Sequence, residues 1–159
     1  MVWLGFAPAH MEWRELFNHP EMLPLLIEMA EDEDVKCRFV SLTAFAVCEK
    51  LQDQSAVPML QRRMRDDIDE HRQIAISAIY AIEQDPRILI EGLDDPSDTN
   101  YRLTVMCLYN LGPEAKVAIP TLERRLNDKN PLVRLAVEAT LAKIDPDRFG
   151  HLMTKQKSK

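Results

Sequence analysis

Apolar residues recur along the chain at helical spacing in two alternating kinds of segment. One kind reads AVPMLQRRM at 56–64 and is repeated as AIPTLERRL at 118–126, with related patterns at 22–30 and 86–93. In each segment a leucine is followed four positions later by another apolar residue, which places both on one face of a helix. We therefore predict four helices, each with one buried stripe, formed by Leu26 and Ala30, Leu60 and Met64, Leu89 and Leu93, and Leu122 and Leu126.

A short acidic or polar turn follows each of these segments, and a second apolar helical pattern begins after it. The second patterns share a large apolar residue, a small residue directly before it and a further apolar residue three positions after it. Such a face packs closely between two layers. The predicted core positions are Phe45 and Cys48, Ile79 and Ile82, Leu108 and Leu111, and Leu141 and Ile144. Good N-cap residues precede three of these helices, at Asp34, Ser97 and Asn130.

The repeating unit is therefore a helix, a polar turn and a second helix, about 29–34 residues long. One such pair has too little core to stand alone, and stacked pairs share a continuous core. We place the repeats at about residues 21–54, 55–85, 86–115 and 116–147. Residues 1–20 are interpreted as an N-terminal cap segment, and 148–159 as a flexible basic tail.

The prolines support this division. The chain has ten prolines and only four glycines, which conflicts with a high helix content unless the prolines lie where helices begin. Pro24, Pro58 and Pro120 fall in the first turn of the first helix of their repeats, where the missing N–H has no helical partner to lose. Pro86 falls one residue earlier at the same boundary. The prolines therefore mark helix starts.

The segments 112–136 and 132–146 carry a recognisable pattern, GPEAKVAIPTLERRLNDKNPLVRLA and LVRLAVEATLAKIDP. This pattern resembles HEAT repeats of the short, phycobilisome-lyase-like subclass, and the resemblance weakens toward the N-terminus. The subclass has Val-Arg at the start of each second helix. Val133-Arg134 matches both residues of this pattern. Arg38 and Arg72 match only its Arg, and in the third repeat Tyr101 takes the position of the Arg.

The resemblance implies an all-α, right-handed α-solenoid of about four HEAT-like helix pairs that acts as a scaffold or adaptor. It also implies that Arg38, Arg72 and Arg134 are structural residues that pair with acidic turn residues. Chromophore-lyase activity is not implied, because the same repeats occur in many unrelated proteins.

Composition and charge limit the classes of partner that the chain can bind. The chain has 159 residues and a net charge of −6; residues 148–159 hold four basic residues and no acidic one, so the rest carries 16 basic against 26 acidic side chains. An acidic body is a poor match for a phosphate backbone, so we do not expect nucleic-acid binding. No apolar run approaches the ~18 residues of a membrane span. Three cysteines without CxxC spacing favour a reduced, cytoplasmic protein without zinc.

In a solenoid of this kind the second helices line the concave surface, and one stripe of their residues forms a ladder from repeat to repeat. This stripe is rich in apolar and aromatic residues, and Tyr, Arg and Met are enriched at protein interfaces. We predict that it binds another protein or a peptide, with the centre at Tyr80, Arg102 and Tyr109. The candidate residues are Phe39, Gln73, Ile76, Tyr80, Arg102, Met106, Tyr109, Leu135 and Glu138. The alternative is that curvature or the terminal segments bury most of the row.

The sequence contains no recognisable catalytic or metal-binding constellation. The four histidines lack HExxH spacing, and there is no GxSxG and no phosphate-binding glycine loop. His71 beside Glu70 is interpreted as a surface residue. The arginine pairs that end two first helices are interpreted as solvated cations that complement the helix C-termini, at Arg62, Arg63, Arg124 and Arg125. We predict no catalytic residue, no metal ligand and no cofactor.

The predicted function is a non-catalytic HEAT-repeat scaffold that binds another protein or peptide on its concave face. Two alternatives belong to other classes. One is a HEAT-like enzyme, of the chromophore-lyase type or the DNA-glycosylase type, the second of which needs a basic concave face with stacking aromatic residues. The other is a purely structural module, in which the solenoid ends join further repeats or a second copy to form a homo-oligomer.

Overall fold

The structure, a computed structural model, describes residues 17–154. These residues belong to two compact units that divide between Gln84 and Asp85, called unit 1 and unit 2 below. Throughout the described range every regular element is a helix and none is a strand, which confirms the all-α prediction. No helix in that range is both long and apolar enough to cross a membrane.

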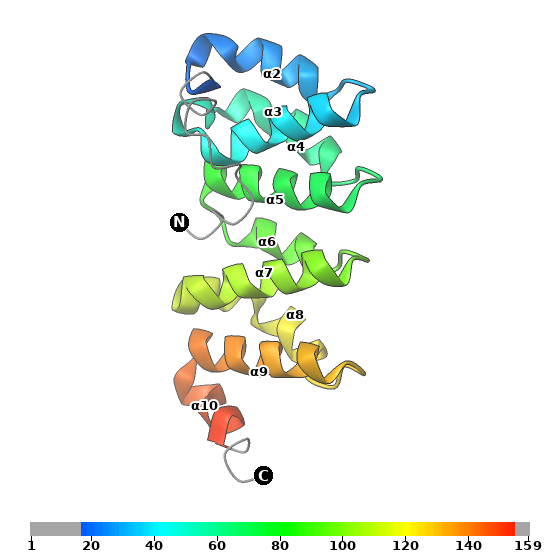
Figure 1. Cartoon of the computed structure of the whole chain (residues 1–159). Helices are drawn as coiled ribbons and strands as arrows, with labels where there is room; N and C mark the ends of the chain where they lie inside the picture. The colour runs from blue at the N-terminus through cyan, green and yellow to red at the C-terminus, as the bar shows by residue number, and fades with distance from the viewer. Residues whose placement is uncertain (1–16, 155–159) are drawn as a thin grey trace. The chain divides into compact units, whose positions relative to one another are not determined.

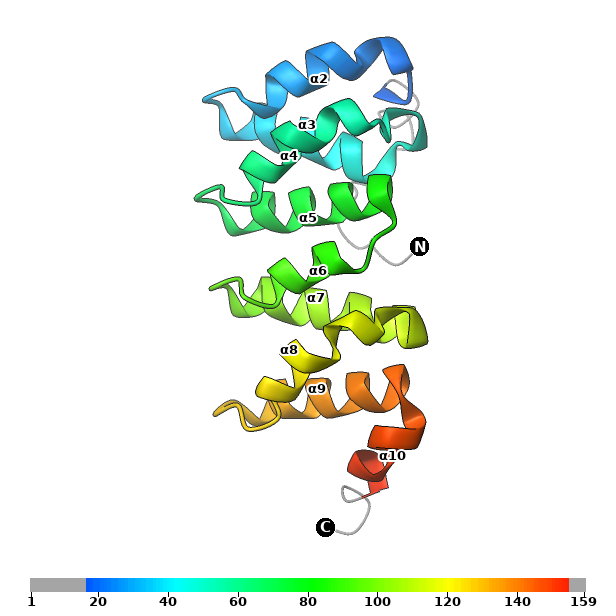
Figure 2. The ribbon, with the colours of Figure 1, turned by 180° about the vertical axis from the view of Figure 1, so that it is seen from behind.

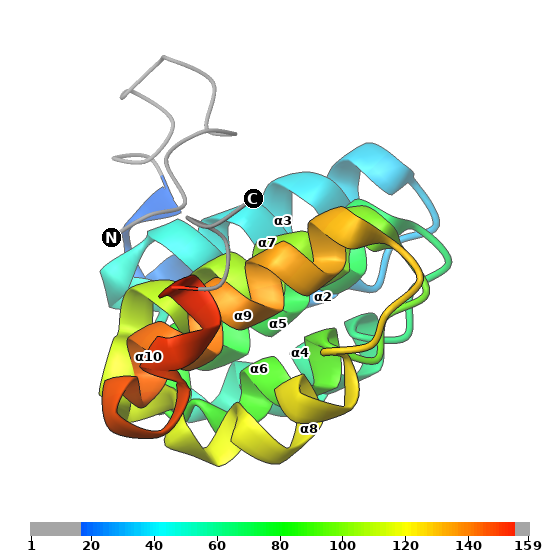
Figure 3. The same cartoon turned by 90° about the horizontal axis from the view of Figure 1, so that it is seen from below.

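Unit 1 contains two helix pairs. The first is α2 (Leu23–Ala30) with α3 (Val35–Val47), and the second is α4 (Val57–Arg63) with α5 (Asp69–Glu83). Within the unit, α3 packs against α5, while α2 and α4 form the other layer (Figures 1 and 3). Short 3-10 helices precede α2 and connect the pairs, at Pro20–Met22 (η1), Glu49–Leu51 (η2) and Gln54–Ala56 (η3).

Unit 2 repeats the arrangement. Its pairs are α6 (Arg87–Gly92) with α7 (Asp98–Leu111) and α8 (Ile119–Arg124) with α9 (Pro131–Ile144). The 3-10 segment η4 (Gly112–Ala118) connects them, starting at Gly112, whose φ of 57° favours glycine. α7 packs against α9, and Figure 2 shows α6 and α8 in the layer facing the viewer.

The core follows most of the predicted positions, although Met64, Ile82, Leu111 and Leu126 are only half-buried. On the first helices, Leu26, Leu60, Leu89 and Leu122 are at most 2% exposed. The large residues predicted for the second helices are fully buried, at Phe45, Ile79, Leu108 and Leu141. The prolines also lie as predicted, because Pro24, Pro58 and Pro120 occupy the first two positions of their helices and Pro86 is the N-cap of α6.

The turn inside each pair is built by an aspartate two residues before the N-cap. Its carboxylate accepts a hydrogen bond from the backbone N–H of the N-cap residue, at 2.7 to 3.0 Å, in all four turns. These aspartates are Asp32, Asp66, Asp95 and Asp128. The backbone before each second helix is thereby fixed by a residue of the same turn.

An arginine six residues after that aspartate closes three of the four turns. Arg38 Nη1 donates to the carbonyl oxygens of Asp32 and Glu33 at 2.9 and 3.0 Å. Arg72 and Arg134 repeat this contact with the corresponding carbonyls. In the third turn Tyr101 takes the arginine position, as predicted, and its ring is covered instead by the guanidinium of Arg125, 4.5 Å from the ring centroid.

The C-terminal segment differs from the prediction of a flexible tail from residue 148. Helix α10 (Pro146–Thr154) occupies residues 148–154 and packs against α9. Asp145 starts the helix by accepting from the Arg148 N–H at 3.2 Å, and Phe149 is 5% exposed. The prediction weighed the lysines and overlooked the apolar spacing of Phe149 and Leu152. The predicted cap segment, 1–20, lies almost entirely outside the described residues.

The N-caps allow a matched test of local stability. Asp34 accepts from two backbone N–H groups of α3, whereas Ser97, at the same place before α7, makes no capping bond with its side chain. Asp34→Ala should therefore lower the free energy of unfolding of unit 1 by about 1 kcal/mol. Ser97→Ala should change the free energy of unfolding of unit 2 by a few tenths of a kcal/mol at most. Amide hydrogen exchange followed by mass spectrometry measures both, because it reports each helix separately.

Candidate functional site

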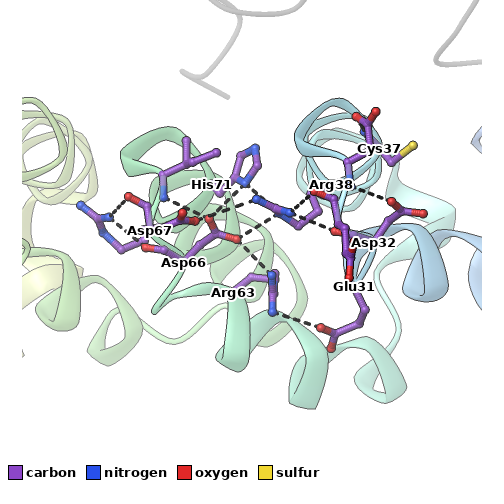
Figure 4. Close-up of polar contacts among 12 residues, drawn as sticks. Glu31, Asp32, Cys37, Arg38, Arg63, Asp66, Asp67 and His71 are labelled. Atoms are coloured by element: carbon purple, nitrogen blue, oxygen red, sulfur yellow. Dashed lines mark hydrogen bonds and ion pairs between the residues drawn. The ribbon is translucent and has the colours of Figure 1, made fainter.

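A buried polar cluster ties together the three helices α3, α4 and α5 of unit 1 (Figure 4). Its centre is Asp66, whose side chain is 1% exposed and lies in the turn before α5. One carboxylate oxygen of Asp66 lies 3.3 Å from Arg38 Nε and 3.1 Å from Arg63 Nη1. The other accepts from the Ile68 N–H at 3.0 Å and lies 3.3 Å from His71 Nδ1. One carboxylate therefore meets groups from all three helices.

His71 was interpreted from the sequence as a surface residue, and this was wrong. Its exposure is 1%, and its ring lies 6.3 Å from that of Phe39. Arg38 Nε has a single hydrogen and lies near both His71 Nδ1, at 3.4 Å, and Asp66. The direction of that N–H gives the hydrogen bond to His71 Nδ1, while Arg38 Nε and the Asp66 carboxylate form an ion pair.

The charge of Asp66 is stabilised by its neighbours. Burial alone raises the pKa of this carboxyl group. Hydrogen bonds from the Ile68 N–H and with Asp67, and the charges of His71 and Arg38, outweigh burial and hold the pKa below its usual value. Asp66 is therefore a carboxylate at neutral pH, and the cluster is an ion-paired network.

The arginine pair that ends α4 extends this cluster. Glu31 forms ion pairs with Arg62 at 2.6 Å and with Arg63 at 3.1 Å. Because Arg63 also pairs with Asp66, it bridges the two carboxylates. In unit 2, Arg124 donates to Thr121 and Arg125 lies over Tyr101. The interpretation of these arginines as merely solvated is therefore incomplete, because Arg62, Arg63 and Arg125 also contact other elements, whereas Arg124 contacts only its own helix.

The cluster is suited to holding helices together. Asp66 and His71 are 1% exposed, so a substrate in solvent does not reach them. Cys37, on the same part of α3, is a thiol at neutral pH, because burial and the charges of Asp32 and Asp34 raise its pKa. Among the described residues no three His, Cys, Asp or Glu side chains are grouped to hold a metal ion.

The predicted binding row is largely closed on unit 1. Gln73 and Ile76 are 3% and 2% exposed, so the prediction that they form an open surface is corrected. The reason is that α5 is buried over more of its circumference than a single amphipathic stripe requires, at His71, Gln73, Ala75, Ile76, Ala78 and Ile79. Phe39 and Tyr80 are half-buried.

On unit 2 the row is open. Arg102, Met106 and Tyr109 follow one another at helical spacing along one face of α7, and all are exposed, Met106 by 41% and Tyr109 by 42%. On α9, Leu135 is 44% exposed and Glu138 is half-buried. Five of the nine predicted residues therefore lie together on the second helices of unit 2.

Two further residues belong to this surface and were missed. Leu132 precedes Leu135 by three positions and is 63% exposed, the largest exposed fraction among the large apolar residues described. Lys143 follows Leu132 by eleven positions, three helical turns, and is also exposed. The spacing could have revealed both. We call the surface formed by Arg102, Met106, Tyr109, Leu132, Leu135 and Lys143 the α7/α9 face.

No protein-family model matches this chain, and no curated protein matches it significantly. The resemblance to HEAT repeats therefore rests on the residues themselves.

Proposed function

We propose that the protein is a non-catalytic HEAT-repeat scaffold that binds another protein or peptide through the α7/α9 face. The observation that carries the proposal is the distribution of exposed apolar side chains. Nine large apolar residues of the described range are exposed, and four of them lie on this one face: Met106, Tyr109, Leu132 and Leu135. Clustered apolar exposure of this kind is typical of interaction sites.

The repeat character of the chain supports the scaffold part of the proposal. All four turns use the same aspartate contact, and three use the same arginine contact. Together with the Val133-Arg134 pattern, this favours HEAT-like repeats in a right-handed α-solenoid. In such a fold the second helices form the concave surface, and α7 and α9 are second helices of their pairs.

The buried cluster of unit 1 does not favour an enzyme over a scaffold. Its charged groups are matched to one another and to backbone groups, and each of those contacts joins two elements of the fold. An ion-paired network in a buried position is a structural device in many proteins. The proposal therefore gives this cluster no part in chemistry.

A site-specific cross-linking experiment tests the function. A photo-reactive amino acid is placed at Met106 in the full chain, expressed in its native cell, and at Val117 in a control. Val117 is equally exposed, 43% against 41%, but lies on η4. We expect a discrete cross-linked protein at position 106 and none of it at 117. Adding Leu135→Glu should abolish the product, because a charge then replaces an apolar contact.

The same adducts at both positions, or no adduct at position 106, would contradict the proposal. Circular dichroism of the Leu135→Glu variant provides the folding control. Leu135 is 44% exposed, so its substitution should leave the helix content unchanged.

A further inference from the structure

Two cations border the apolar part of the α7/α9 face. Arg102 lies one turn before Met106 on α7, and Lys143 lies toward the C-terminal end of α9. Both are exposed, and within residues 17–154 neither makes an ion pair or a side-chain hydrogen bond. The acidic residues of these helices are placed differently. Asp98 is in the first turn of α7, where negative charge is favourable, and Glu138 is half-buried and already has a partner.

The exposed charge that borders the apolar residues is thus positive, on a chain whose net charge is −6. An apolar surface with cations at its ends is complementary to an apolar segment with carboxylates at its ends. This charge complementarity identifies the class of partner.

The backbone of this face selects a helical partner over an extended one. An extended peptide gains its affinity mainly from main-chain hydrogen bonds to an open strand edge. The N–H and C=O groups along α7 and α9 are used inside those helices, so an extended peptide would leave its own backbone without protein partners. A helix satisfies its own backbone and brings only side chains to the surface.

The distance between the two cations determines how far apart the acidic residues of the partner must lie. The core residues Leu108 and Leu141 are equivalent, so Lys143 of α9 lies level with Asn110 of α7. Asn110 is eight residues beyond Arg102, which is about 12 Å along a helix axis. Adjacent helix axes lie about 8–10 Å apart, so the backbone positions of the two cations are separated by about 15 Å. This is the length of about ten helical residues, and a spacing of eleven returns to the same helix face.

We propose that the partner of the α7/α9 face is an amphipathic helix that carries acidic residues eleven positions apart, with large apolar residues between them on the same face. One carboxylate meets Arg102 and the other meets Lys143, while the apolar residues cover Met106, Tyr109 and Leu135. This inference rests on the proposed function and specifies the chemistry of the partner.

A pair of designed peptides tests the proposal. The acidic probe is a fluorescein-labelled, alanine-based 15-residue helix with Glu at positions 2 and 13 and Leu at positions 6, 9 and 10. The swapped probe has Lys in place of both Glu residues. Fluorescence anisotropy with the full chain at low salt should show the acidic probe binding about tenfold more tightly, a difference of about 1.4 kcal/mol. The preference should shrink at about 0.5 M salt, because ions screen exposed charges.

Charge reversal of the protein is the decisive variant. The double substitution Arg102→Glu and Lys143→Glu should reverse the preference, so that the swapped probe binds more tightly. The matched control, Lys36→Glu with Lys50→Glu, changes the net charge equally at two exposed lysines of unit 1 and should keep the preference for the acidic probe.

Three results would overturn the proposal. If both probes bind equally and Leu135→Glu weakens both equally, the face is an apolar docking surface and its partner need not be acidic. If neither probe binds but a protein is cross-linked at position 106, the proposed function stands and the partner has a different chemistry. Self-association of the chain that is abolished by the Arg102→Glu and Lys143→Glu substitutions in sedimentation equilibrium would show that a second copy occupies the face.

Discussion

Asp66→Ala should lower the free energy of unfolding of unit 1 by about 3 kcal/mol, because it removes the shared carboxylate of a buried ion-paired network. Arg38 and His71 would stay buried without that partner, and the Ile68 N–H would lose its acceptor. The loss should lie at the low end of the range for broken buried pairs. Arg38 keeps its bonds to two backbone carbonyls, and Arg63 keeps Glu31. Hydrogen exchange of α3 and α5 measures the change.

Asp69→Ala is the matched control. Asp69 also pairs with an arginine, Arg72 at 2.7 Å, but its side chain is 58% exposed. Exposed pairs contribute about 0.2–1 kcal/mol, so a loss as large as that of Asp66→Ala would show that burial is not the cause.

The pH dependence gives this prediction a second readout. The pKa of Asp66 is lower in the folded chain than in the unfolded chain, so its stabilisation is fully present above the ordinary aspartate pKa near 4. It is lost as the pH falls through the folded-state value. The difference between the wild-type chain and Asp66→Ala should therefore shrink as the pH falls below about 4.

Gly92→Ala should destabilise unit 2 by about 2 kcal/mol. A Cβ atom at Gly92 would clash with Thr104 Oγ1 and would lie 3.3 Å from Thr104 Cβ, so Thr104 or the packing of α6 against α7 would have to shift. Overpacking of this kind costs about 1–3 kcal/mol, and the better helix propensity of alanine offsets up to about 1 kcal/mol. Chemical denaturation with hydrogen exchange of α6 and α7 as the probe measures the effect.

Two further variants separate overpacking from a general intolerance of alanine. Adding Thr104→Ala to Gly92→Ala removes most of the clash and should restore more than half of the lost stability; additive losses would contradict the explanation. Gly150→Ala, in α10, has nothing within 4 Å of the added Cβ. It should be neutral or stabilising, since alanine replaces a flexible residue inside a helix.

The helices and the core could be predicted from the sequence because both follow from local periodicity. Leu26, Leu60, Leu89 and Leu122 lie at one phase of an apolar repeat, and all four are buried. The N-caps at Asp34 and Asn130 are equally local, since the capping side chain and the backbone it binds are two or three residues apart. Helix α10 was missed because the basic residues near the C-terminus masked a short apolar pattern.

The polar cluster of unit 1 could be predicted only in part, because the resemblance implied that Arg38 pairs with an acidic turn residue but not which residue or what else meets it. Asp66, Arg38 and Glu31 belong to three different elements, and only their packing makes one carboxylate the partner of several cations. The burial of His71 has the same origin. A histidine beside acidic residues is typical of a solvated turn, and no local pattern reveals that α3 covers it.

The predicted binding row contains one part whose exposure was predicted correctly and one part whose exposure was not. On α7 a helical stripe of Arg102, Met106 and Tyr109 was predicted to be exposed, and it is exposed. On α5 the equivalent reasoning failed at Gln73 and Ile76, because burial around that helix depends on what packs against it. Periodicity gives the phase of a face along a helix, but it does not give the width of the buried sector.

In three of the four pairs the turn between the helices is closed within seven consecutive residues, from the aspartate that binds the N-cap to the arginine that binds the turn carbonyls. A stretch of DNA that encodes one such pair thus also encodes the groups that close its own turn. Tandem duplication of such a stretch yields a copy whose turn forms without compensating changes elsewhere. Divergence can then alter the exposed side chains of one copy, as at Arg102, Met106 and Tyr109 on α7, while the architecture is inherited unchanged.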